Sequence, residues 1–300
     1  MKRFFQLLLI LQCLILWHPL SGNGVVIING TQGIYLKMLS SDVRVQVQNQ
    51  IAVVTSTQVF INTTGEKTPM RYAFPLHPNA NAIDLRWYIK GKWHYAIISK
   101  STQTDTIPGE PGEQIQQNLL TYMGNTPLLF TPMDSIDADS SVTFVLKYVE
   151  LLPYSFGVVK FAYPNDYSLI QADQFVDHQH FSFELKSERT IESAEIATLD
   201  ATVQLTPHEA TITSDLYEQP ALIDYEVLYQ LSSTELGVYS LSTFLPDSLL
   251  YCDELGNGYV SLIIEPESNA STEVIEKNFS LIIDRSGSMA GVKVEEAKRA

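Results

Sequence analysis

Asp284, Ser286 and Ser288 form the strongest candidate for a chemical site in this 300-residue chain. They lie in the segment DRSGSM, where one carboxylate and two hydroxyl groups alternate along a short loop. Carboxylate and hydroxyl oxygens are hard ligands of the kind that Mg²⁺ and Mn²⁺ prefer. Gly287 has no side chain and lets such a loop turn tightly. A divalent metal site is therefore one interpretation of this spacing.

Two other interpretations of the same loop stay open. Ser and Asp residues before a helix are common N-caps, and a helix N-terminus favours anions over cations. The spacing alone favours the metal site and the helix cap about equally. An apolar strand that ends in Asp also opens phosphoaspartate phosphotransferases, but Ser286 stands where those enzymes usually have a second acid. The sequence also has no Ser/His/Asp order, CxxC pair or phosphate-binding glycine loop, so we predict no catalytic residue.

His178 and His180 form a weaker candidate in the segment DHQHF. Residues two apart on a strand share one face, so both imidazoles could bind one metal ion. The sequence offers no evident third ligand, and a solvated or packed histidine is the commoner case. Asp134, Asp137 and Asp139 are grouped in MDSIDADSS, but that segment lacks the glycine and distal glutamate of a calcium loop. It predicts a turn into the next strand.

The elements that must position these residues are mostly β-strands. Residues 43–47, 85–89 and 142–148 alternate apolar and polar side chains, which indicates half-buried strands. Gly91 separates two such runs and predicts a hairpin turn. Helical periodicity is weak. The pattern predicts a mainly β protein, with a β-sandwich-like domain over residues 25–165.

The segment before Asp284 has a different character. Residues 279–283 are apolar except for Ser280, as in a strand that is buried on both faces of a parallel sheet. In α/β sheets of this kind, ligands bind at the carboxyl ends of the strands, where Asp284 would lie. We therefore expect the mainly β part to be followed by the start of an α/β (Rossmann-like) domain.

Charge is spread unevenly along the chain. The net charge is −15, and residues 166–277 hold 21 acidic residues but only three basic ones, Lys186, Arg189 and Lys277. This step predicts a boundary near residue 165 and an acidic, β-rich connector after it. A solvated acidic surface is the favoured interpretation, and a surface that attracts cations or basic partners is the alternative. So acidic a chain would repel nucleic acid and anionic membranes.

Residues 1–22 have the pattern of a signal peptide. Lys2 and Arg3 precede an apolar run from Leu7 to Trp17 that is too short to span a bilayer comfortably. No later segment is long and apolar enough to do so, and we therefore expect a secreted or cell-surface protein without a membrane span. Cys252 would be the only cysteine left after cleavage, which excludes an internal disulfide.

The segment FSLIIDRSGSMAG resembles the first strand and the metal-ion-dependent adhesion site of a von Willebrand factor type A (VWA) domain. Upstream, the Y-x-FPL element of residues 72–76 lies in a strand pattern that resembles the VIT domain (vault protein and inter-α-trypsin type). Together the two are similar to inter-α-trypsin inhibitor heavy chains. The resemblance implies a VIT domain over residues 25–165 and a VWA fragment over residues 278–300, truncated after its first strand and the start of a helix.

The resemblance implies a non-enzymatic interaction protein. In such adhesion sites Mg²⁺ or Mn²⁺ is held by the D-x-S-x-S loop and by a Thr and an Asp from later loops, and an acidic side chain of the partner completes the shell. Asp284, Ser286 and Ser288 match the motif, but the later loops do not fall within this chain, so we expect its metal binding to be weak or absent. The implied partners are extracellular or surface protein or matrix ligands. The alternative is a structural β-scaffold in which the loop only caps a helix.

Overall fold

The computed structural model is mainly β, which confirms the predicted fold class. It describes residues 23–29, 32–96, 117–124, 127–129, 134–155, 157–232, 237–244 and 258–265. The chain divides into two compact units, Met1–Ser268 and Asn269–Ala300. All the described residues lie in the first unit, and the expected start of an α/β domain lies outside them.

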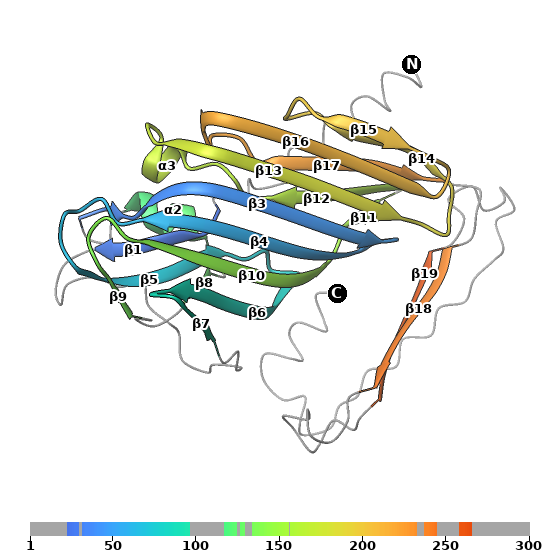
Figure 1. The fold of residues 1–300 in the computed structure, drawn as a ribbon. Helices are drawn as coiled ribbons and strands as arrows, with labels where there is room; N and C mark the ends of the chain where they lie inside the picture. The colour runs from blue at the N-terminus through green and yellow to red at the C-terminus, as the bar shows by residue number, and fades with distance from the viewer. Residues whose placement is uncertain are drawn as a thin grey trace, which may run out of the picture. The chain divides into compact units, whose positions relative to one another are not determined.

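A sheet of eight strands forms the larger layer of this unit (Figure 1). Its strand order is β15–β16–β13–β3–β4–β10–β6–β7. Neighbouring strands are antiparallel except for β13 and β3, which run parallel. The strand bounds are β3 Lys37–Gln48, β4 Ile51–Ile61, β6 Ala80–Ile89, β7 Lys92–Tyr95, β10 Ser141–Leu151, β13 Phe175–Lys186, β15 Thr202–Leu205 and β16 Glu209–Pro220.

Three smaller sheets complete the described strands. A five-stranded sheet consists of β1 Val25–Asn29, β2 Ile34–Tyr35, β5 Thr68–Pro75, β8 Pro127–Leu129 and β9 Asp134–Ile136. A four-stranded sheet consists of β11 Tyr154–Ser155, β12 Val158–Tyr163, β14 Ile191–Ile196 and β17 Tyr225–Leu231. A two-stranded sheet consists of β18 Gly237–Phe244 and β19 Gly258–Glu265.

The alternating runs form strands with one buried face, as predicted. In β3 the valines of residues 43–47 are buried while the polar residues between them face outward. The runs at 85–89 and 142–148 bury their apolar residues in the same way. Lys90 and Gly91 both have positive φ, 50° and 76°, and form the two-residue turn between β6 and β7. This geometry is typical of a type I′ hairpin and confirms the predicted turn.

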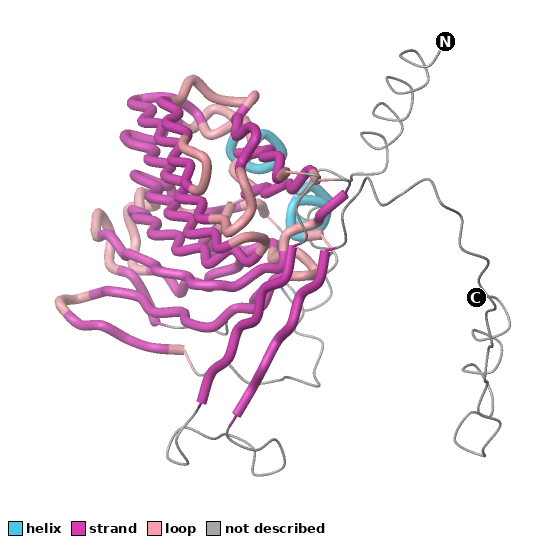
Figure 2. Tube along the Cα trace, turned by 90° about the vertical axis from the view of Figure 1, so that its right-hand side faces the viewer, coloured by secondary structure: helices cyan, strands magenta, loops and turns pink. Residues whose placement is uncertain are grey.

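Aromatic side chains fill the space between the layers. Tyr72 of β5 stacks on Phe144 of β10 at a centroid distance of 4.4 Å. Phe161 of β12 packs against Phe183 of β13 at a centroid distance of 5.6 Å. Buried aromatic residues from the smaller sheets thus pack on the inner face of the eight-stranded sheet. Figure 2 shows the layers after a turn of 90° about the vertical axis from Figure 1. Burial of such large apolar surfaces is the main stabilising term for a fold of this kind.

The strands after residue 165 share this sheet and this core with the strands before it. β13 pairs with β3 across a large sequence separation, and β17 pairs with β12. The β3–β4 turn is held in place from the later part of the chain: Asn49 N donates to Lys186 O at 2.8 Å, and Tyr229 Oη donates to Asn49 O at 2.6 Å. The step in charge density at residue 165 therefore falls within one continuous packed unit.

The two described helices are short. α2 covers Gln117–Met123 and α3 covers Ser168–Gln171. Leu119, Tyr122 and Met123 anchor α2 in the core. In the described part of the chain, neither helix is long or apolar enough to cross a membrane.

Candidate functional site

The predicted metal ligands Asp284, Ser286 and Ser288 lie outside the described residues. The same holds for the predicted signal peptide and for Cys252. The adhesion-type metal site therefore stays a prediction. The described residues contain two other groups of polar side chains, one buried and one exposed.

The buried group is a network of neutral side chains centred on Asn23. Gln58 Nε2 donates to Asn23 Oδ1 at 2.7 Å, and Asn23 Nδ2 donates to Asn165 Oδ1 at 2.9 Å. Tyr72 Oη donates to Gln58 Oε1 at 2.8 Å, and Asn165 Nδ2 donates to Gln179 Oε1 at 3.1 Å. All five side chains are buried. The network thus connects the segment before β1 with β4, β5 and β13.

Gly24 lets the chain approach this network closely. A Cβ atom at this position would lie 2.2 Å from Gln58 Oε1 and 2.3 Å from Tyr72 Oη. Tyr167 Oη donates to the Gly24 carbonyl oxygen, and Tyr122 Oη donates to Asn23 O at 2.7 Å. The space around Gly24 is filled by bonded groups, so a side chain has no room there.

The tyrosines of the network are held in their neutral form. Tyr163 Oη also donates to Asn23 Oδ1, at 2.5 Å. Burial raises the pKa of the Tyr72, Tyr122 and Tyr163 hydroxyls well above their usual value. A neutral buried hydroxyl that already donates a hydrogen bond offers neither a nucleophile nor an accessible proton acceptor near neutral pH. The buried network is therefore a structural one that fixes the packing of the two layers.

Asp224 supports the backbone beside this network. Its Oδ1 accepts hydrogen bonds from Asn165 N at 2.8 Å and from Asp166 N at 2.9 Å. Burial of the carboxyl raises the pKa of Asp224 from 3.8 to about 6, although the two backbone donors act in the opposite direction. Desolvation thus outweighs hydrogen bonding at this carboxyl.

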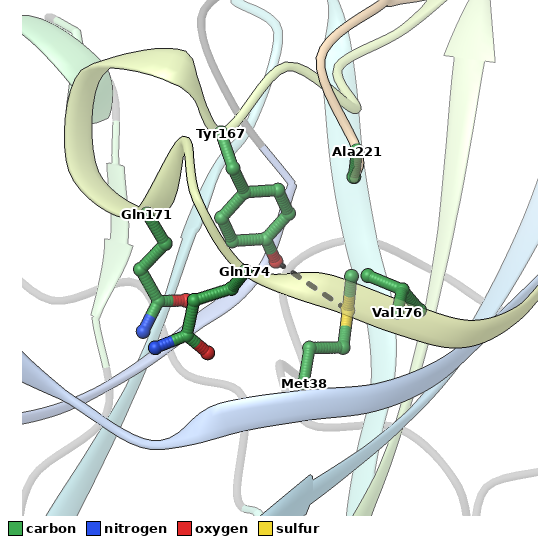
Figure 3. A pocket seen from close by; sticks show the side chains of 6 residues that line it. All are labelled: Met38, Tyr167, Gln171, Gln174, Val176 and Ala221. Carbon is green, nitrogen blue, oxygen red and sulfur yellow. Dashed lines mark hydrogen bonds between the residues drawn. The ribbon is translucent and has the colours of Figure 1, made fainter. Parts of the chain in front are cut away.

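A small cavity lies next to the network (Figure 3). Its volume is about 10 Å³, close to the minimum for one water molecule. In Figure 3 the Tyr167 hydroxyl points towards the sulfur of Met38, and the two atoms are 3.6 Å apart. The cavity lies between these two side chains and is lined further by Gln171, Gln174, Val176 and Ala221. It is too small for an organic ligand.

The aspartates between β9 and β10 form a turn, as predicted. Ser140 N donates to Asp137 O at 3.3 Å, and Asp139 adopts a positive φ of 55°. Asp137 and Asp139 line an open groove of about 370 Å³ beside the β6–β7 turn. Lys67 Nζ lies 3.5 Å from Asp137 Oδ1 on the exposed surface, so this carboxylate has a cationic neighbour.

The exposed group of polar side chains lies on the outer face of the eight-stranded sheet. His178 and His180 are two residues apart on β13, and Asp215 of β16 is the cross-strand partner of His180. Asp215 Oδ1 lies 2.8 Å from His178 Nε2 and 2.9 Å from His180 Nδ1. The ligand atoms of all three residues lie within 4.8 Å of one another. We call these three residues the His–Asp cluster.

The surroundings hold the His–Asp cluster in place and leave it open to solvent. The ring of Tyr217 stacks on His178 at a centroid distance of 4.6 Å and an interplanar angle of 7°. The side chains of His178 and Asp215 are 41% and 44% exposed, and that of His180 is 25% exposed. The hydrogen bond to His178, and to a smaller extent the one to His180, lowers the pKa of the Asp215 carboxyl below its usual value. The carboxyl is therefore ionised at neutral pH.

The structure thus confirms that His178 and His180 share a face and supplies the third group that the sequence did not reveal. Asp215 lies 35 residues after His180, and only the β13–β16 register brings the two together. No spacing motif in the sequence marks this pair. Two imidazole nitrogens and one carboxylate oxygen are a common ligand set for transition metals.

Comparison with known families adds one match. Residues 38–148 match the family model of the vault protein inter-alpha-trypsin (VIT) domain. The match begins in β3 and ends in β10, within the predicted range 25–165. It confirms the VIT part of the resemblance, whereas the VWA part stays a prediction. No curated protein matches the chain.

Several solved structures resemble the chain only distantly. A Legionella pneumophila protein described as a nutrient binding protein has 11% identity and a TM-score of 0.48, covering 70% of this chain and 72% of its own. An M1 zinc metallopeptidase from Deinococcus radiodurans has 12% identity and a TM-score of 0.36, covering 70% of this chain and 44% of its own. With TM-scores below 0.5, these likenesses support no conclusion about fold or activity.

Proposed function

We propose that the protein is an exported, non-enzymatic interaction protein that binds acidic groups of protein or matrix ligands through a divalent cation. The cation would be Mg²⁺ or Mn²⁺, and its ligands in this chain would be Asp284, Ser286 and Ser288. The VIT match at residues 38–148 is the observation that carries the interaction role. The metal-dependent part rests on the D-x-S-G-S sequence and on its resemblance to a VWA adhesion site.

The proposed chemistry explains why a cation is needed. An acidic ligand side chain would be repelled by a protein with a net charge of −15 unless a cation lies between the two. Mg²⁺ keeps several of its six positions for water or for a ligand carboxylate when one loop supplies only three oxygens. The loop would therefore select acidic partners, and binding would depend on the metal.

Metal dependence gives the first test of this proposal. Matrix proteins would be immobilised, and binding of the chain measured by surface plasmon resonance in Mg²⁺ and in EDTA. We expect any binding through this loop to be lost in EDTA and in Asp284→Ala, and kept in Ser280→Ala, which changes a serine of the apolar segment 279–283. An aspartate-bearing peptide should compete, and its asparagine counterpart should not. Binding that persists in EDTA would exclude the adhesion-type site and favour the structural-scaffold alternative.

Titration of the metal alone gives a second test. With three oxygen ligands from one loop, we expect this chain to bind Mg²⁺ weakly or not at all by calorimetry. Tight uptake of one Mg²⁺ per chain that is lost in Asp284→Ala would show that the loop holds its ion without further protein ligands.

A further inference from the structure

The His–Asp cluster of His178, His180 and Asp215 has the geometry of an incomplete metal shell. In a zinc site the ligand atoms lie about 2.0–2.2 Å from the ion, and therefore about 3 Å apart at right angles or about 3.4 Å apart in a tetrahedron. Asp215 Oδ1 already lies at 2.8 Å and 2.9 Å from the two imidazole nitrogens. The two imidazole nitrogens lie within 4.8 Å of each other, so they would have to come up to about 1.4 Å closer together to share an ion, and the partly exposed side chains can rotate to do so.

The strands fix the directions from which these ligands approach. His178 and His180 project from one face of β13 because side chains alternate along a strand. Asp215 projects from the paired strand β16, and Tyr217, the cross-strand partner of His178, stacks on its ring. Sites built on paired strands hold their ligands more precisely than sites built on loops.

The charges around the cluster favour a cation. The cluster lies in the segment with 21 acidic and three basic residues. On the other side, β3 pairs with β13 so that Asp42 lies beside His180 in the register. The nearby guanidinium of Arg44 is bonded to the Asp42 carboxylate at 2.9–3.2 Å, so its charge is largely balanced.

We propose that His178, His180 and Asp215 bind one divalent transition-metal ion of the Zn²⁺ class on the outer face of the sheet. Imidazole nitrogen selects such ions over Mg²⁺ and Ca²⁺, which prefer oxygen alone. Three protein ligands leave at least one position on the solvent side for water or for a side chain of a partner. This site is independent of the loop at Asp284 and of the function proposed for it.

Direct binding of Zn²⁺ is the test. The full chain, freed of metal, would be titrated with Zn²⁺ by calorimetry near neutral pH in a buffer that does not bind metal. We expect one Zn²⁺ per chain, at least about 10-fold weaker binding in Asp215→Asn, and a larger loss in the double variant His178→Gln/His180→Gln. Titration with Cu²⁺ should give an electron paramagnetic resonance spectrum with coupling to two nitrogens, which the double variant should lack.

Three matched controls separate this site from other Zn²⁺ ligands in the chain. His94→Gln removes a half-buried histidine of the same sheet that stacks on Trp87. Cys252→Ser removes a thiol, and Asp284→Ala removes the carboxylate of the predicted adhesion loop. All three should bind Zn²⁺ as the native chain does. The proposal would be overturned if the native chain takes up no stoichiometric Zn²⁺, or if the double variant, shown to be folded by circular dichroism, binds it with native affinity.

Discussion

The buried Asn23 network and the exposed His–Asp cluster both consist of polar side chains from strands that are distant in sequence. They differ in their exposure to solvent and in whether their polar groups are free to bind a ligand. In the network, amide and hydroxyl groups donate to and accept from one another with solvent excluded. In the cluster, two titratable imidazoles share one carboxylate oxygen and remain partly exposed. A closed neutral network stabilises a fold, whereas an open set of titratable groups can exchange hydrogen bonds for an ion.

The two aspartates that adjoin these groups differ in the same way. Burial raises the pKa of Asp224, beside the network, whereas hydrogen bonds to His178 and His180 lower the pKa of Asp215 in the cluster. The environment thus favours the neutral form of one carboxyl and the charged form of the other. Substitutions at the network should therefore change stability, and substitutions at the cluster should change ligand binding.

The largest effect is expected from Gly24→Ala. The new methyl group would lie about 2.2 Å from a bonded, fully buried oxygen, and neither Gln58 nor Tyr72 can move without breaking the network. We expect a loss of about 3 kcal/mol in the free energy of unfolding, measured by urea denaturation. Gly65→Ala is the control, because its positive φ of 78° strains a side chain but no atom lies within 4 Å of the new Cβ; it should cost about 1 kcal/mol. Equal losses in the two variants would contradict a closed network.

A smaller effect is expected at Asp224. Asp224→Ala would leave the backbone N–H groups of Asn165 and Asp166 without their acceptor, at a cost of about 2 kcal/mol. Asp224→Asn keeps an oxygen acceptor and should be at least as stable as the native chain at neutral pH, because it avoids burying a charge.

The raised pKa of Asp224 fixes the direction of its pH dependence. Between pH 3.8 and about 6 the folded state binds the proton more tightly than the unfolded state. The stabilising contribution of this group is therefore complete below pH 3.8 and is lost as the pH rises through about 6. Urea denaturation near pH 4 and near pH 7 should show this fall for the native chain relative to Asp224→Asn. A difference between the two chains that does not change with pH would contradict the raised pKa.

The smallest effect on stability is expected at the His–Asp cluster. In the absence of metal, His178→Gln/His180→Gln should change the free energy of unfolding by no more than about 0.5 kcal/mol, because the substituted side chains are partly exposed and glutamine can still bond to Asp215. The same urea denaturation measures this change. A loss comparable to that of Gly24→Ala would mean that the cluster is a structural element.

Local patterns in the sequence predicted much of the fold. The valines of residues 43–47 and the Gly91 turn are specified by neighbours in the chain, because alternation and positive φ are local properties. The pairing of β13 with β3 could not be predicted in this way, since it joins residues more than a hundred positions apart. The step in charge at residue 165 reflects composition, and no break in packing accompanies it.

The same distinction applies to the sites. His178 and His180 were recognisable because strand periodicity places them on one face. Asp215 was not, because its position beside them depends on the register between β13 and β16, and many other aspartates in the acidic segment were equally eligible. Asn23 and Gly24 were not recognised either, because an asparagine and a glycine before a strand carry no signal of a buried network.

The change in melting temperature on adding Zn²⁺ tests most directly the claim that the two groups have different roles. A ligand that binds only the folded state raises the melting temperature. The native chain should show this rise, and so should Tyr72→Phe, which starts from a lower value because Gln58 Oε1 loses its donor. His178→Gln/His180→Gln should start near the native value and show no rise. A full rise in this double variant, or none in the native chain, would contradict the account.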